Sequence, residues 1–407
     1  MKGRGIHYAT EVGREQFSKR FQDALAMLSH RGPDASGVEM LWDHKTFMGH
    51  TRLAIQDLSS AGSQPMTSQN DNLIISFNGE IYNFPALKKD LISCGYSFFS
   101  NTDTEVILYL YAKYGIDCFA KLDGIFALAI FDKKEDKFII ARDGLGVKPL
   151  YYFKDPSKFV FSSELKAIVK IVGNKNLSLD KKNINRYLTF QWCPGEGTPF
   201  KEIKKHNPGD ILIVKNGRVI DNLSFYQLPI VRPSSKKSNK NVKAVVEQLD
   251  ANLRKAVHDQ MLSDTPVGAF LSGGLDSTSV VSFAKELDPS IMCFTIDTQN
   301  SLNDGLQDDL PYARAAAKFL NVPLEIVKVD PQLLVRNLER MVWMLDEPLG
   351  DPAPLNVLYI SELAKQNGIK VLLSGAGGDD IFTGYRRHRA LIAEKWWSWL
   401  QKSLNLL

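Results

Sequence analysis

The sequence predicts two domains of different fold class, a layered α+β domain followed by a doubly wound α/β domain. Three observations carry this prediction. Short apolar runs of strand length fill residues 1–227, a segment rich in Ser, Lys and Pro covers residues 228–243, and strands alternate with helices in residues 244–407. A chain of 407 residues is also too long for one ordinary hydrophobic core. We therefore expect a linker at 228–243 between the two domains.

The first domain is expected to contain antiparallel sheets flanked by helices. Leu73–Phe77 runs into Asn78-Gly79 and then Glu80–Tyr82, a pattern that favours a hairpin turning at Asn78-Gly79. Apolar periodicity predicts further strands and helices. The strands are Ile125–Phe131, Phe138–Ala141, Tyr151–Phe153 and Phe159–Ser162, and the helices are Phe17–Leu28 and Thr104–Tyr114. Many short strands with a few helices favour a layered α+β domain.

In the second domain the predicted elements alternate. They are a helix near 244–261, a strand ending at Leu271 with a helix after it, strands at 291–296, 324–329 and 370–373, and helices at 311–320, 331–345 and 355–365. Such alternation is typical of a parallel sheet covered by helices. We therefore expect a ligand outside the carboxyl ends of these strands.

The composition is that of an average soluble globular protein. The net charge of +4 arises from 50 basic and 46 acidic residues, so nothing favours a nucleic acid or a membrane surface as partner. The four cysteines lie far apart, which argues against a zinc site and a disulfide framework. No run of about 18 apolar residues occurs, and the first residues lack a signal-peptide core. We expect a cytoplasmic protein that acts on small-molecule substrates. A homodimer is a possible oligomeric state of the chain.

The stretch Val267–Thr278 combines a strand, a tight loop and the start of a helix. Its Ser272-Gly273-Gly274 turn directs backbone N–H groups and the positive end of a helix at an anion, and the glycines let that anion come close. An ordinary βα turn has the same outline. Asp276 favours the anion site, because an acid beside a phosphate needs a cation between them. The loop therefore predicts a nucleotide bound with Mg²⁺.

A second glycine-rich loop, Ser374–Asp380, follows the last predicted strand. Taken alone, Asp379 fits the N-cap of a helix, since Asp is a favoured cap. Two such loops at the carboxyl ends of one parallel sheet converge on one crevice. Asp276 and Asp379 are therefore expected to hold one Mg²⁺ between them.

Seven motifs follow one another in a fixed order along the first domain. They are His30–Asp34, Arg52–Ile55, Gln64–Met66, Phe77–Asn83, Thr102–Glu105, Arg142–Gly146 and Ser163–Ala167. In this order they resemble a class II glutamine amidotransferase domain of the N-terminal-nucleophile type. Ser272–Ser277 resembles the pyrophosphate loop of ATP pyrophosphatases. Together the two modules resemble the glutamine-dependent (glutamine-hydrolysing) asparagine synthetase family over nearly the whole chain.

The resemblance implies a glutamine pocket in the first domain. Arg52 would pair with the α-carboxylate of glutamine and Asp103 would hold its α-amino group. Asn78 and Gly79 would form the oxyanion hole. Without the resemblance, Arg52 fits a surface ion pair and Asn78-Gly79 a type I′ turn. The implied glutamine-binding residues are Arg52, Leu53, Ala54, Ile55, Gln56, Asn78, Gly79, Glu80 and Asp103.

The resemblance also implies an ATP site and a reaction. The metal would lie on Asp276 and Asp379 and neutralise the pyrophosphate leaving group. Aspartate, glutamine and ATP would give asparagine, glutamate, AMP and pyrophosphate through an acyl-adenylate, which makes the chain a carbon–nitrogen ligase. The implied ATP-binding residues are Leu271, Ser272, Gly273, Gly274, Asp276, Ser277, Ile296, Ser374 and Gly375.

Three departures from the family leave alternatives open. The family's nucleophile is an N-terminal cysteine, but the first cysteine here is Cys94, so the chain as written is expected to lack glutaminase activity. The interpretation favoured is an altered or misassigned start of an otherwise intact domain, and the alternative is a protein that uses free ammonia. Ala376 replaces an acid, which opens another acceptor, such as a sugar acid of a surface polysaccharide. The end at Leu407, after Trp396–Trp399, indicates a fragment. A catalytically impaired, nucleotide-binding relic is the third alternative.

Overall fold

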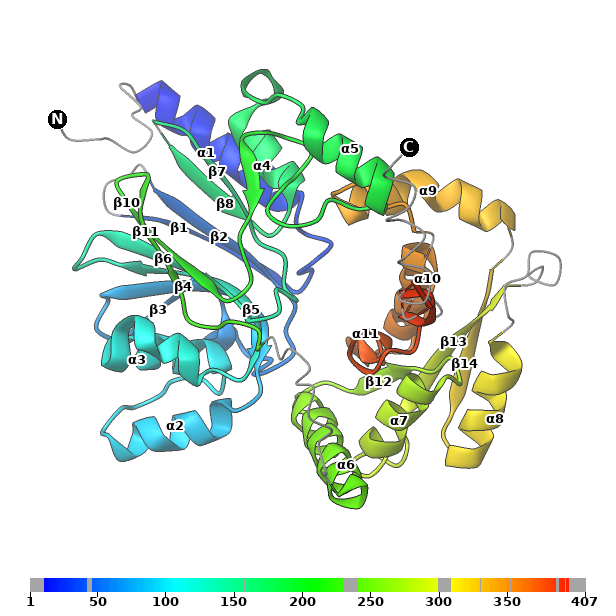
Figure 1. Cartoon of the computed structure of the whole chain (residues 1–407). Coiled ribbons are helices and arrows are strands. Elements are labelled where there is room, and N and C mark those ends of the chain that lie inside the picture. The colour runs from blue at the N-terminus through cyan, green and yellow to red at the C-terminus, as the bar shows by residue number, and fades with distance from the viewer. Residues whose placement is uncertain are drawn as a thin grey trace. The chain divides into compact units, whose positions relative to one another are not determined.

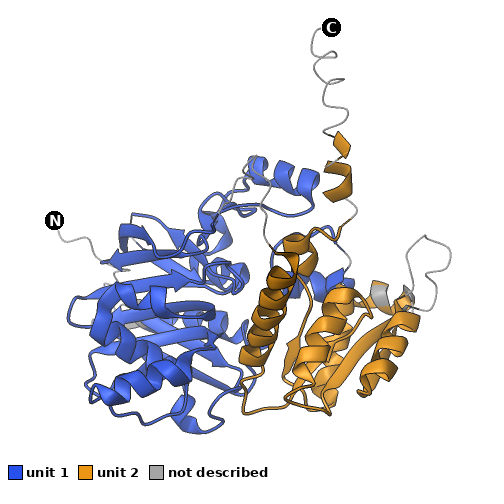
Figure 2. Ribbon diagram, turned by 60° about the horizontal axis from the view of Figure 1, so that its bottom comes forward, with its two compact units in different colours: residues 1–238, 338–354 blue, residues 239–337, 355–407 orange. Residues whose placement is uncertain are grey.

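The computed structural model describes residues 11–41, 46–156, 158–229, 241–298, 309–329, 331–351, 353–385, 388–391 and 393–394. The chain divides into two compact units, shown in two colours in Figure 2. Unit 1 comprises Met1–Ser238 together with Leu338–Pro354, and unit 2 comprises Asn239–Asn337 together with Leu355–Leu407. The expected positions of an N-terminal cysteine, of Trp396–Trp399 and of the linker centre at 230–240 lie outside the described residues.

Unit 1 is built on a six-stranded antiparallel sheet with the strand order β11-β10-β6-β5-β4-β3 (Figure 1). Its strands are β3 (Met66–Thr67), β4 (Leu73–Ile81), β5 (Gly124–Asp132), β6 (Lys137–Arg142), β10 (Asp210–Lys215) and β11 (Arg218–Ser224). Alternate residues point to opposite faces, as the two-residue period of a strand requires. Ile75 and Leu128 enter the core on one face, and Ile74 and Ala129 enter the core on the other.

Two smaller antiparallel sheets form a second layer of unit 1. One pairs β1 (Ala35–Met40) with β2 (Phe47–Arg52), and the other has the order β8-β7-β9, with β7 (Tyr151–Lys154), β8 (Phe159–Ser162) and β9 (Ile203–Lys205). Met48 and Phe161 pack from these sheets against the six-stranded sheet. The layer therefore shares one core with the larger sheet.

Helices cover both outer faces of these layers. Helices α2 (Phe84–Ser93) and α3 (Asp103–Tyr114) pack on the six-stranded sheet, while α1 (Glu11–Ala26) and α4 (Leu165–Val172) pack on the second layer. Helix α5 (Lys181–Phe190) completes the helices that lie wholly in unit 1. The order helix, sheet, sheet, helix confirms the predicted layered α+β fold.

The hairpin predicted at Asn78-Gly79 is wrong. Strand β4 continues through both residues and pairs with β5 from Leu73 to Ile81. A Cβ at Gly79 would lie 2.2 Å from Ile125 O, so glycine is needed here for the close approach of two strands and not for a turn. The strand therefore presents Asn78 and Gly79 from a rigid sheet.

Unit 2 contains a four-stranded parallel sheet with the order β14-β13-β12-β15. The strands are β12 (Val267–Phe270), β13 (Met292–Thr298), β14 (Leu324–Val329) and β15 (Val371–Leu373). The helices that lie wholly or partly in this unit are α6 (Val242–Gln260), α7 (Leu275–Ala284), α8 (Leu310–Leu320), α9 (Pro331–Leu345), α10 (Ala353–Gln366) and α11 (Gly378–Phe382). The end of α9 and the first two residues of α10 belong to the 338–354 segment of unit 1. Helices α6, α7 and α8 cover one face and α10 covers the other, which confirms the doubly wound α/β fold.

The strand order of unit 2 reverses between β12 and β15. The chain moves outward from β12 through β13 to β14, and then returns to place β15 on the other side of β12. In open α/β sheets such a reversal opens a crevice at the carboxyl ends of the two strands. The loops after β12 and β15 are the two glycine-rich loops singled out in the sequence.

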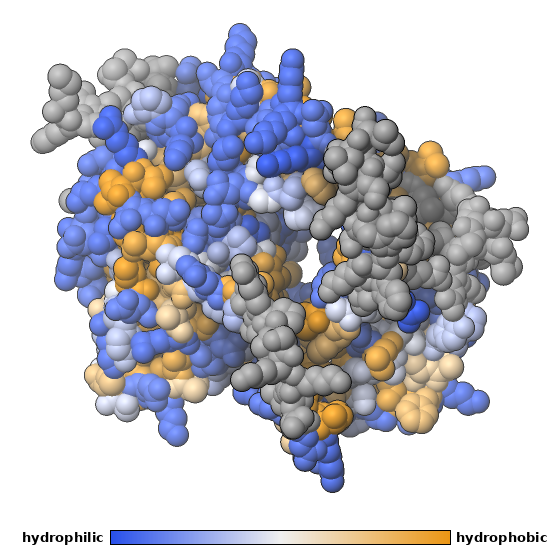
Figure 3. All heavy atoms as spheres, viewed as in Figure 1, coloured by the Kyte–Doolittle hydropathy of each residue, from blue (hydrophilic) through white to orange (hydrophobic). Residues whose placement is uncertain are grey.

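Hydrophilic and hydrophobic side chains are interspersed over the face shown in Figure 3. Among the described residues, no helix is both long enough and apolar enough to cross a bilayer.

Candidate functional site

A polar cavity of about 380 Å³ lies in unit 1 beside β2, β4 and the start of α3. Eight of the nine residues predicted to bind glutamine line it: Arg52, Leu53, Ile55, Gln56, Asn78, Gly79, Glu80 and Asp103. The ninth, Ala54, donates its backbone N–H to Asp34 Oδ2 at 2.8 Å. The fold therefore brings three separate stretches of the sequence to one polar cavity.

Arg52 is buried at the end of β2, with 7% of its surface exposed. Its Nη1 donates to Ser59 O at 2.8 Å, and its Nη2 donates to Gln56 O at 3.2 Å and to Asp57 O at 2.5 Å. The alternative of a surface ion pair is therefore wrong. A guanidinium carries five N–H donors, so these three bonds leave two donors for a ligand among the described contacts.

Asn78 presents an unused donor to the polar cavity. Among the described residues, its buried Nδ2 has no hydrogen-bond partner. An unpaired buried donor is costly in a folded protein unless a ligand or water satisfies it. Asn78 and the neighbouring Gly79 lie within β4, so both are held by the ladder to β5. A rigid, unpaired donor is what an oxyanion hole requires.

The carboxyl groups of Glu80 and Asp103 lie in the polar cavity, and the charge of Asp103 affects the pKa of Glu80. Burial, together with the charge of Asp103, raises the pKa of Glu80 although Gln56 Nε2 donates to Glu80 Oε2 at 2.5 Å. Burial likewise raises the pKa of Asp103, and the N–H of Ile81, which donates to its Oδ2 at 3.0 Å, only partly opposes this. Two neighbouring carboxylates disfavour double ionisation, and the charge of Lys148 opposes this only in part at Glu80. A ligand ammonium group would remove that penalty.

Several lining residues were not predicted to have a role. Lys148, His50, His30 and Arg31 also line the polar cavity. Burial and the charge of Arg52 lower the pKa of His50 to about 4, so this ring is neutral near pH 7 and its Nδ1 lies 3.1 Å from Ser76 Oγ. His30 and Arg31 belong to a motif noted in the sequence, but only the folded chain shows that they reach this cavity.

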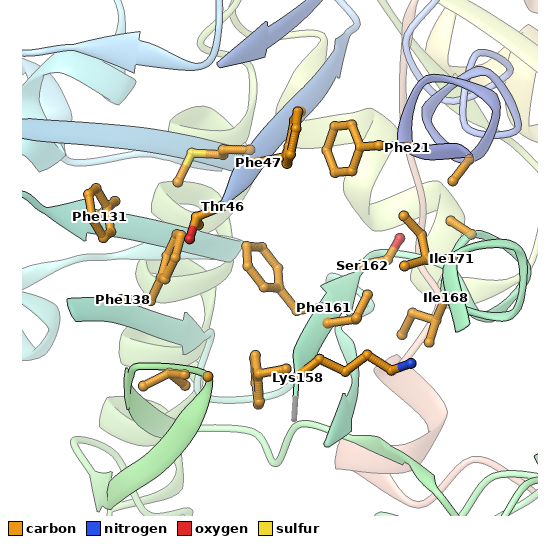
Figure 4. A pocket seen from close by; sticks show the side chains of 18 of the residues that line it. Phe21, Thr46, Phe47, Phe131, Phe138, Lys158, Phe161, Ser162, Ile168 and Ile171 are labelled. Carbon is orange, nitrogen blue, oxygen red and sulfur yellow. The ribbon is translucent and has the colours of Figure 1, made fainter. Parts of the chain in front are cut away.

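A second cavity in unit 1, of about 340 Å³, is lined mainly by apolar side chains (Figure 4). Phe21 and Phe47 lie on one side of it, Phe131 and Phe138 on another, and Ile171 on α4 closes a third. Ligand sites combine apolar walls with a few convergent polar groups. The polar cavity has such groups in Arg52, Asn78 and Asp103, and it is therefore the candidate site of unit 1.

In unit 2 the loop after β12 is ordered by its own serines. Ser272 Oγ lies 3.0 Å from Ser277 Oγ, and Gly274 N donates to Ser272 Oγ at 3.3 Å. Gly273 has φ +79°, and a Cβ there would lie 2.3 Å from the carbonyl carbon of Tyr312. The loop thus needs glycine at this position, and it leads directly into the first turn of the ten-residue helix α7, which carries Asp276.

The loop after β15 lies directly against this turn. A Cβ at Gly375 would lie 2.7 Å from Ser277 N, and a Cβ at Gly378 would lie 2.2 Å from Asp276 Oδ2. The two glycine-rich loops therefore converge at the strand-order reversal, with Ser374 exposed beside them. Ile296 lies near the end of β13, the strand next to β12.

Asp276 and Asp379 are the metal ligands proposed for this crevice. Asp379 lies in the first turn of α11, whose N-cap is Gly377, so the N-cap interpretation of Asp379 is wrong. No cluster of three or more His, Cys, Asp or Glu side chains suited to a metal occurs among the described residues. Two carboxylates nevertheless fit Mg²⁺, which takes its remaining ligands from waters and substrate phosphates.

Comparison with known proteins gives two domain matches and several relatives that match over most of this chain. A family model described as a glutamine amidotransferase domain matches residues 5–226, and one described as asparagine synthase matches residues 248–406. The chain is 33% identical over 373 residues to glutamine-hydrolysing asparagine synthetase 1 of Bacillus subtilis, a match covering 91% of this chain and 56% of that protein.

Two further relatives also match over most of this chain. A protein of Methanocaldococcus jannaschii, provisionally named glutamine-hydrolysing asparagine synthetase 2, is 34% identical over 405 residues, covering 94% of this chain and 76% of that protein. Amidase chry2 of Gibberella zeae is 29% identical over 391 residues, covering 92% and 57%. The chain thus spans little more than half the length of the Bacillus and Gibberella proteins.

Proposed function

Because this chain belongs to the glutamine-hydrolysing asparagine synthetase family, we propose that it is an ATP-dependent carbon–nitrogen ligase that converts a carboxylate to an amide. The observation that carries the proposal is the convergence of two glycine-rich loops where the strand order reverses between β12 and β15. Nucleotides bind at such a point in open α/β sheets. Backbone N–H groups of the loop at Ser272–Gly274 and the start of α7 would hold the phosphates.

The proposed reaction has two steps, adenylation of the acceptor and attack by ammonia. A carboxylate oxygen of the acceptor attacks the α-phosphorus of ATP, the bond to the β-phosphate oxygen breaks, and pyrophosphate leaves. The nitrogen of ammonia then attacks the acyl carbon, and AMP leaves with the bonding electrons as a proton is lost from nitrogen. When bound, Mg²⁺ neutralises the charge of the pyrophosphate leaving group. Asp276 and Asp379 would hold it, and the serines of the first loop would keep that loop rigid.

The polar cavity of unit 1 is proposed as a glutamine site. Arg52 supplies two N–H donors for an α-carboxylate, Asp103 and Glu80 supply negative charge for an α-ammonium, and Asn78 supplies an unpaired donor for the side-chain amide oxygen. These groups match the ends of glutamine in charge and in hydrogen-bonding capacity. We propose glutamine both as the ligand of this cavity and as the source of the amide nitrogen, because the family to which the chain belongs is glutamine-hydrolysing.

Aspartate is the acceptor proposed first, which makes the product asparagine. Ala376 favours a second candidate, a ligase of the same chemistry that amidates another carboxylate. Its exposed methyl group lies within the loop at Ser374–Asp380, and a methyl group cannot transfer a proton during attack by ammonia. A sugar acid is the alternative acceptor.

Pyrophosphate release across a panel of carboxylates tests these proposals. The full chain would be incubated with Mg²⁺–ATP and ammonium chloride, or with glutamine in place of ammonium, and with aspartate, glutamate, glucuronate or galacturonate. Release that requires aspartate supports asparagine formation, and release that requires a sugar acid supports the second candidate. Mg²⁺–ATP binding without release from any acceptor would instead identify a nucleotide-binding protein without ligase activity.

A further inference from the structure

Helix α4 is capped by a residue 180 positions further along the chain. Its own N-cap residue, Glu164, makes no side-chain capping bond. Instead, Lys166 N donates to Asp346 Oδ1 at 3.0 Å and Leu165 N donates to Asp346 Oδ2. A carboxylate in this position satisfies the free N–H groups of the first turn and complements the positive end of the helix. Asp346 therefore fixes the start of α4.

Asp346 adopts a backbone conformation that few non-glycine residues take. Its φ is +67°, in the left-handed region. Its side chain is only 6% exposed and also lies 3.3 Å from Lys166 Nζ. Residues held in sparsely populated backbone regions persist where surrounding contacts determine them, and such residues concentrate at functional sites. The conformation of Asp346 is thus fixed by its bonds to α4.

The contacts of Asp346 continue to the wall of the polar cavity. Lys166 Nζ lies 2.5 Å from Glu164 Oε2, and Glu164 Oε1 lies 2.9 Å from His30 Nε2 and 3.2 Å from Arg31 Nη1. His30 and Arg31 line the cavity. Glu164 can hold both of them because Asp346 has taken over the capping of α4.

Trp343 supports the same wall from the side. The ring centroids of Trp343 and His30 lie 5.0 Å apart in an edge-on arrangement, and Lys166 Nζ lies 4.6 Å from the centroid of the Trp343 ring. A cation over an indole ring is an attractive contact. Trp343 and Asp346 both belong to the 338–354 segment, which is part of unit 1 although the residues on either side of it belong to unit 2.

We infer that Asp346 and Trp343 are positioning residues for the glutamine site: through α4, Lys166 and Glu164 they hold His30 and Arg31 in the conformation that binds the ligand. The inference rests on the proposed function only in naming glutamine as that ligand. Neither residue lines the polar cavity, so each acts through its neighbours. A segment flanked on both sides by the nucleotide-binding unit thereby sets the shape of a cavity in unit 1.

Calorimetric titration of L-glutamine into the full chain tests the inference with four variants. Asp346→Ala removes the cap and the ion pair and is expected to weaken glutamine binding about tenfold. Asp346→Asn keeps an acceptor for one backbone N–H and is expected to recover part of this loss. Trp343→Leu is expected to weaken binding about threefold. Glu339→Gln changes an exposed acid in the same segment and is expected to bind like the wild type.

Two further measurements keep the outcomes distinct. Mg²⁺–ATP binding should be unchanged in all four variants, which shows that the chain is folded. Amide hydrogen exchange of His30–Arg31 and Leu165–Lys166 should accelerate in Asp346→Ala, with or without glutamine. A folded Asp346→Ala variant with wild-type exchange at these amides, or with wild-type glutamine affinity, overturns the inference. A wild-type chain that binds no glutamine refutes the proposed ligand, and the exchange measurement then decides the positioning role.

Discussion

The polar cavity of unit 1 and the paired glycine-rich loops of unit 2 are built from different kinds of polar group. The polar cavity uses buried side chains, with Arg52 held by three carbonyl groups and Asp103 4% exposed. The paired loops of unit 2 lead into the start of α7, and the serines at 272 and 277 bond mainly to the loop itself. Fixed buried charges suit a small zwitterion, whereas a helix start with two carboxylates suits a polyphosphate that arrives with a cation.

The difference predicts where single substitutions act. When a buried charged side chain of the polar cavity is removed, water cannot take over the bonds that it made. Its substitution should therefore change both ligand binding and the free energy of unfolding. The partly exposed carboxylates of the crevice carry no such folding role, so their loss should affect chemistry and leave stability near that of the wild type.

The largest effect is expected at Asp276. Asp276→Ala should lower the rate of acceptor-dependent pyrophosphate release at least about a hundredfold, because one of two metal ligands is lost. The midpoint of urea unfolding should shift little. Asp250→Asn, at an exposed ion pair on α6, is the matched control and should retain the rate. A rate for Asp276→Ala within threefold of the wild type would refute the assignment of this carboxylate to the metal.

The next effect is expected at Asp103. Asp103→Asn keeps an acceptor for the N–H of Ile81 but removes the charge proposed for the ligand ammonium. Glutamine binding should weaken about ten- to a hundredfold, the usual range for a hydrogen bond to a charged group. Calorimetry measures this, with the exposed Asp117→Asn as control. Equal affinities for Asp103→Asn and wild type would show that the ammonium is held elsewhere.

A smaller effect, on the free energy of unfolding, should distinguish Gly375 from Gly274 in the two glycine-rich loops. A Cβ at Gly375 would lie 2.7 Å from Ser277 N, whereas a Cβ at Gly274 would meet only Ser272 Oγ, at 3.4 Å. Gly375→Ala should therefore lower the free energy of unfolding by about 1–3 kcal/mol, and Gly274→Ala by less than about 1 kcal/mol. Urea unfolding followed by the far-ultraviolet circular dichroism signal measures the free energy of unfolding of both variants. Equal costs for the two variants would argue against the close packing of the two loops.

Local patterns in the sequence are enough to place the two glycine-rich loops side by side, but they do not by themselves place the walls of the polar cavity. The crevice is built from two contiguous stretches, Ser272–Ser277 and Ser374–Asp379, each placed by the strand that precedes it. Alternation of strands and helices is enough to bring such stretches together. The strands and helices predicted for this region lie within about two residues of their observed bounds, while the short helix α11 was not predicted.

The polar cavity depends on contacts between residues that no local pattern joins. Asn78-Gly79 has the composition of a tight turn, yet β4 passes through it because β5 supplies nine consecutive pairing positions from Leu73 to Ile81. Tertiary pairing has overridden the local preference. The cap of α4 by Asp346 spans 180 residues, and a sequence shows helix caps only when they are adjacent to the helix. The motifs that contain His30, Arg31 and Glu164 were therefore recognised, but the contacts between these residues were not predicted.

The smallest effect is a dependence of stability on pH that arises from the carboxyl groups of the polar cavity. Burial raises the pKa of Glu80 and of Asp103. As the pH rises above the ordinary carboxyl pKa of about 4, these groups ionise in the unfolded chain while the folded chain retains protons, so stability falls toward neutral pH. Glu80→Gln should remove part of this fall and raise the free energy of unfolding near pH 7.5 by about 1–2 kcal/mol.

Urea unfolding at pH 5, 6, 7 and 8 measures the effect, with Glu135→Gln as the control because that side chain is 62% exposed. Glutamine should oppose the fall in the wild type, since its ammonium favours the ionised carboxylates, and its stabilisation should grow with pH. Asp276→Asn in unit 2 should leave the pH profile unchanged. Parallel profiles for the wild type and Glu80→Gln would mean that the cavity already neutralises this carboxylate without a ligand, with Lys148 as the cation whose charge lowers the pKa of Glu80.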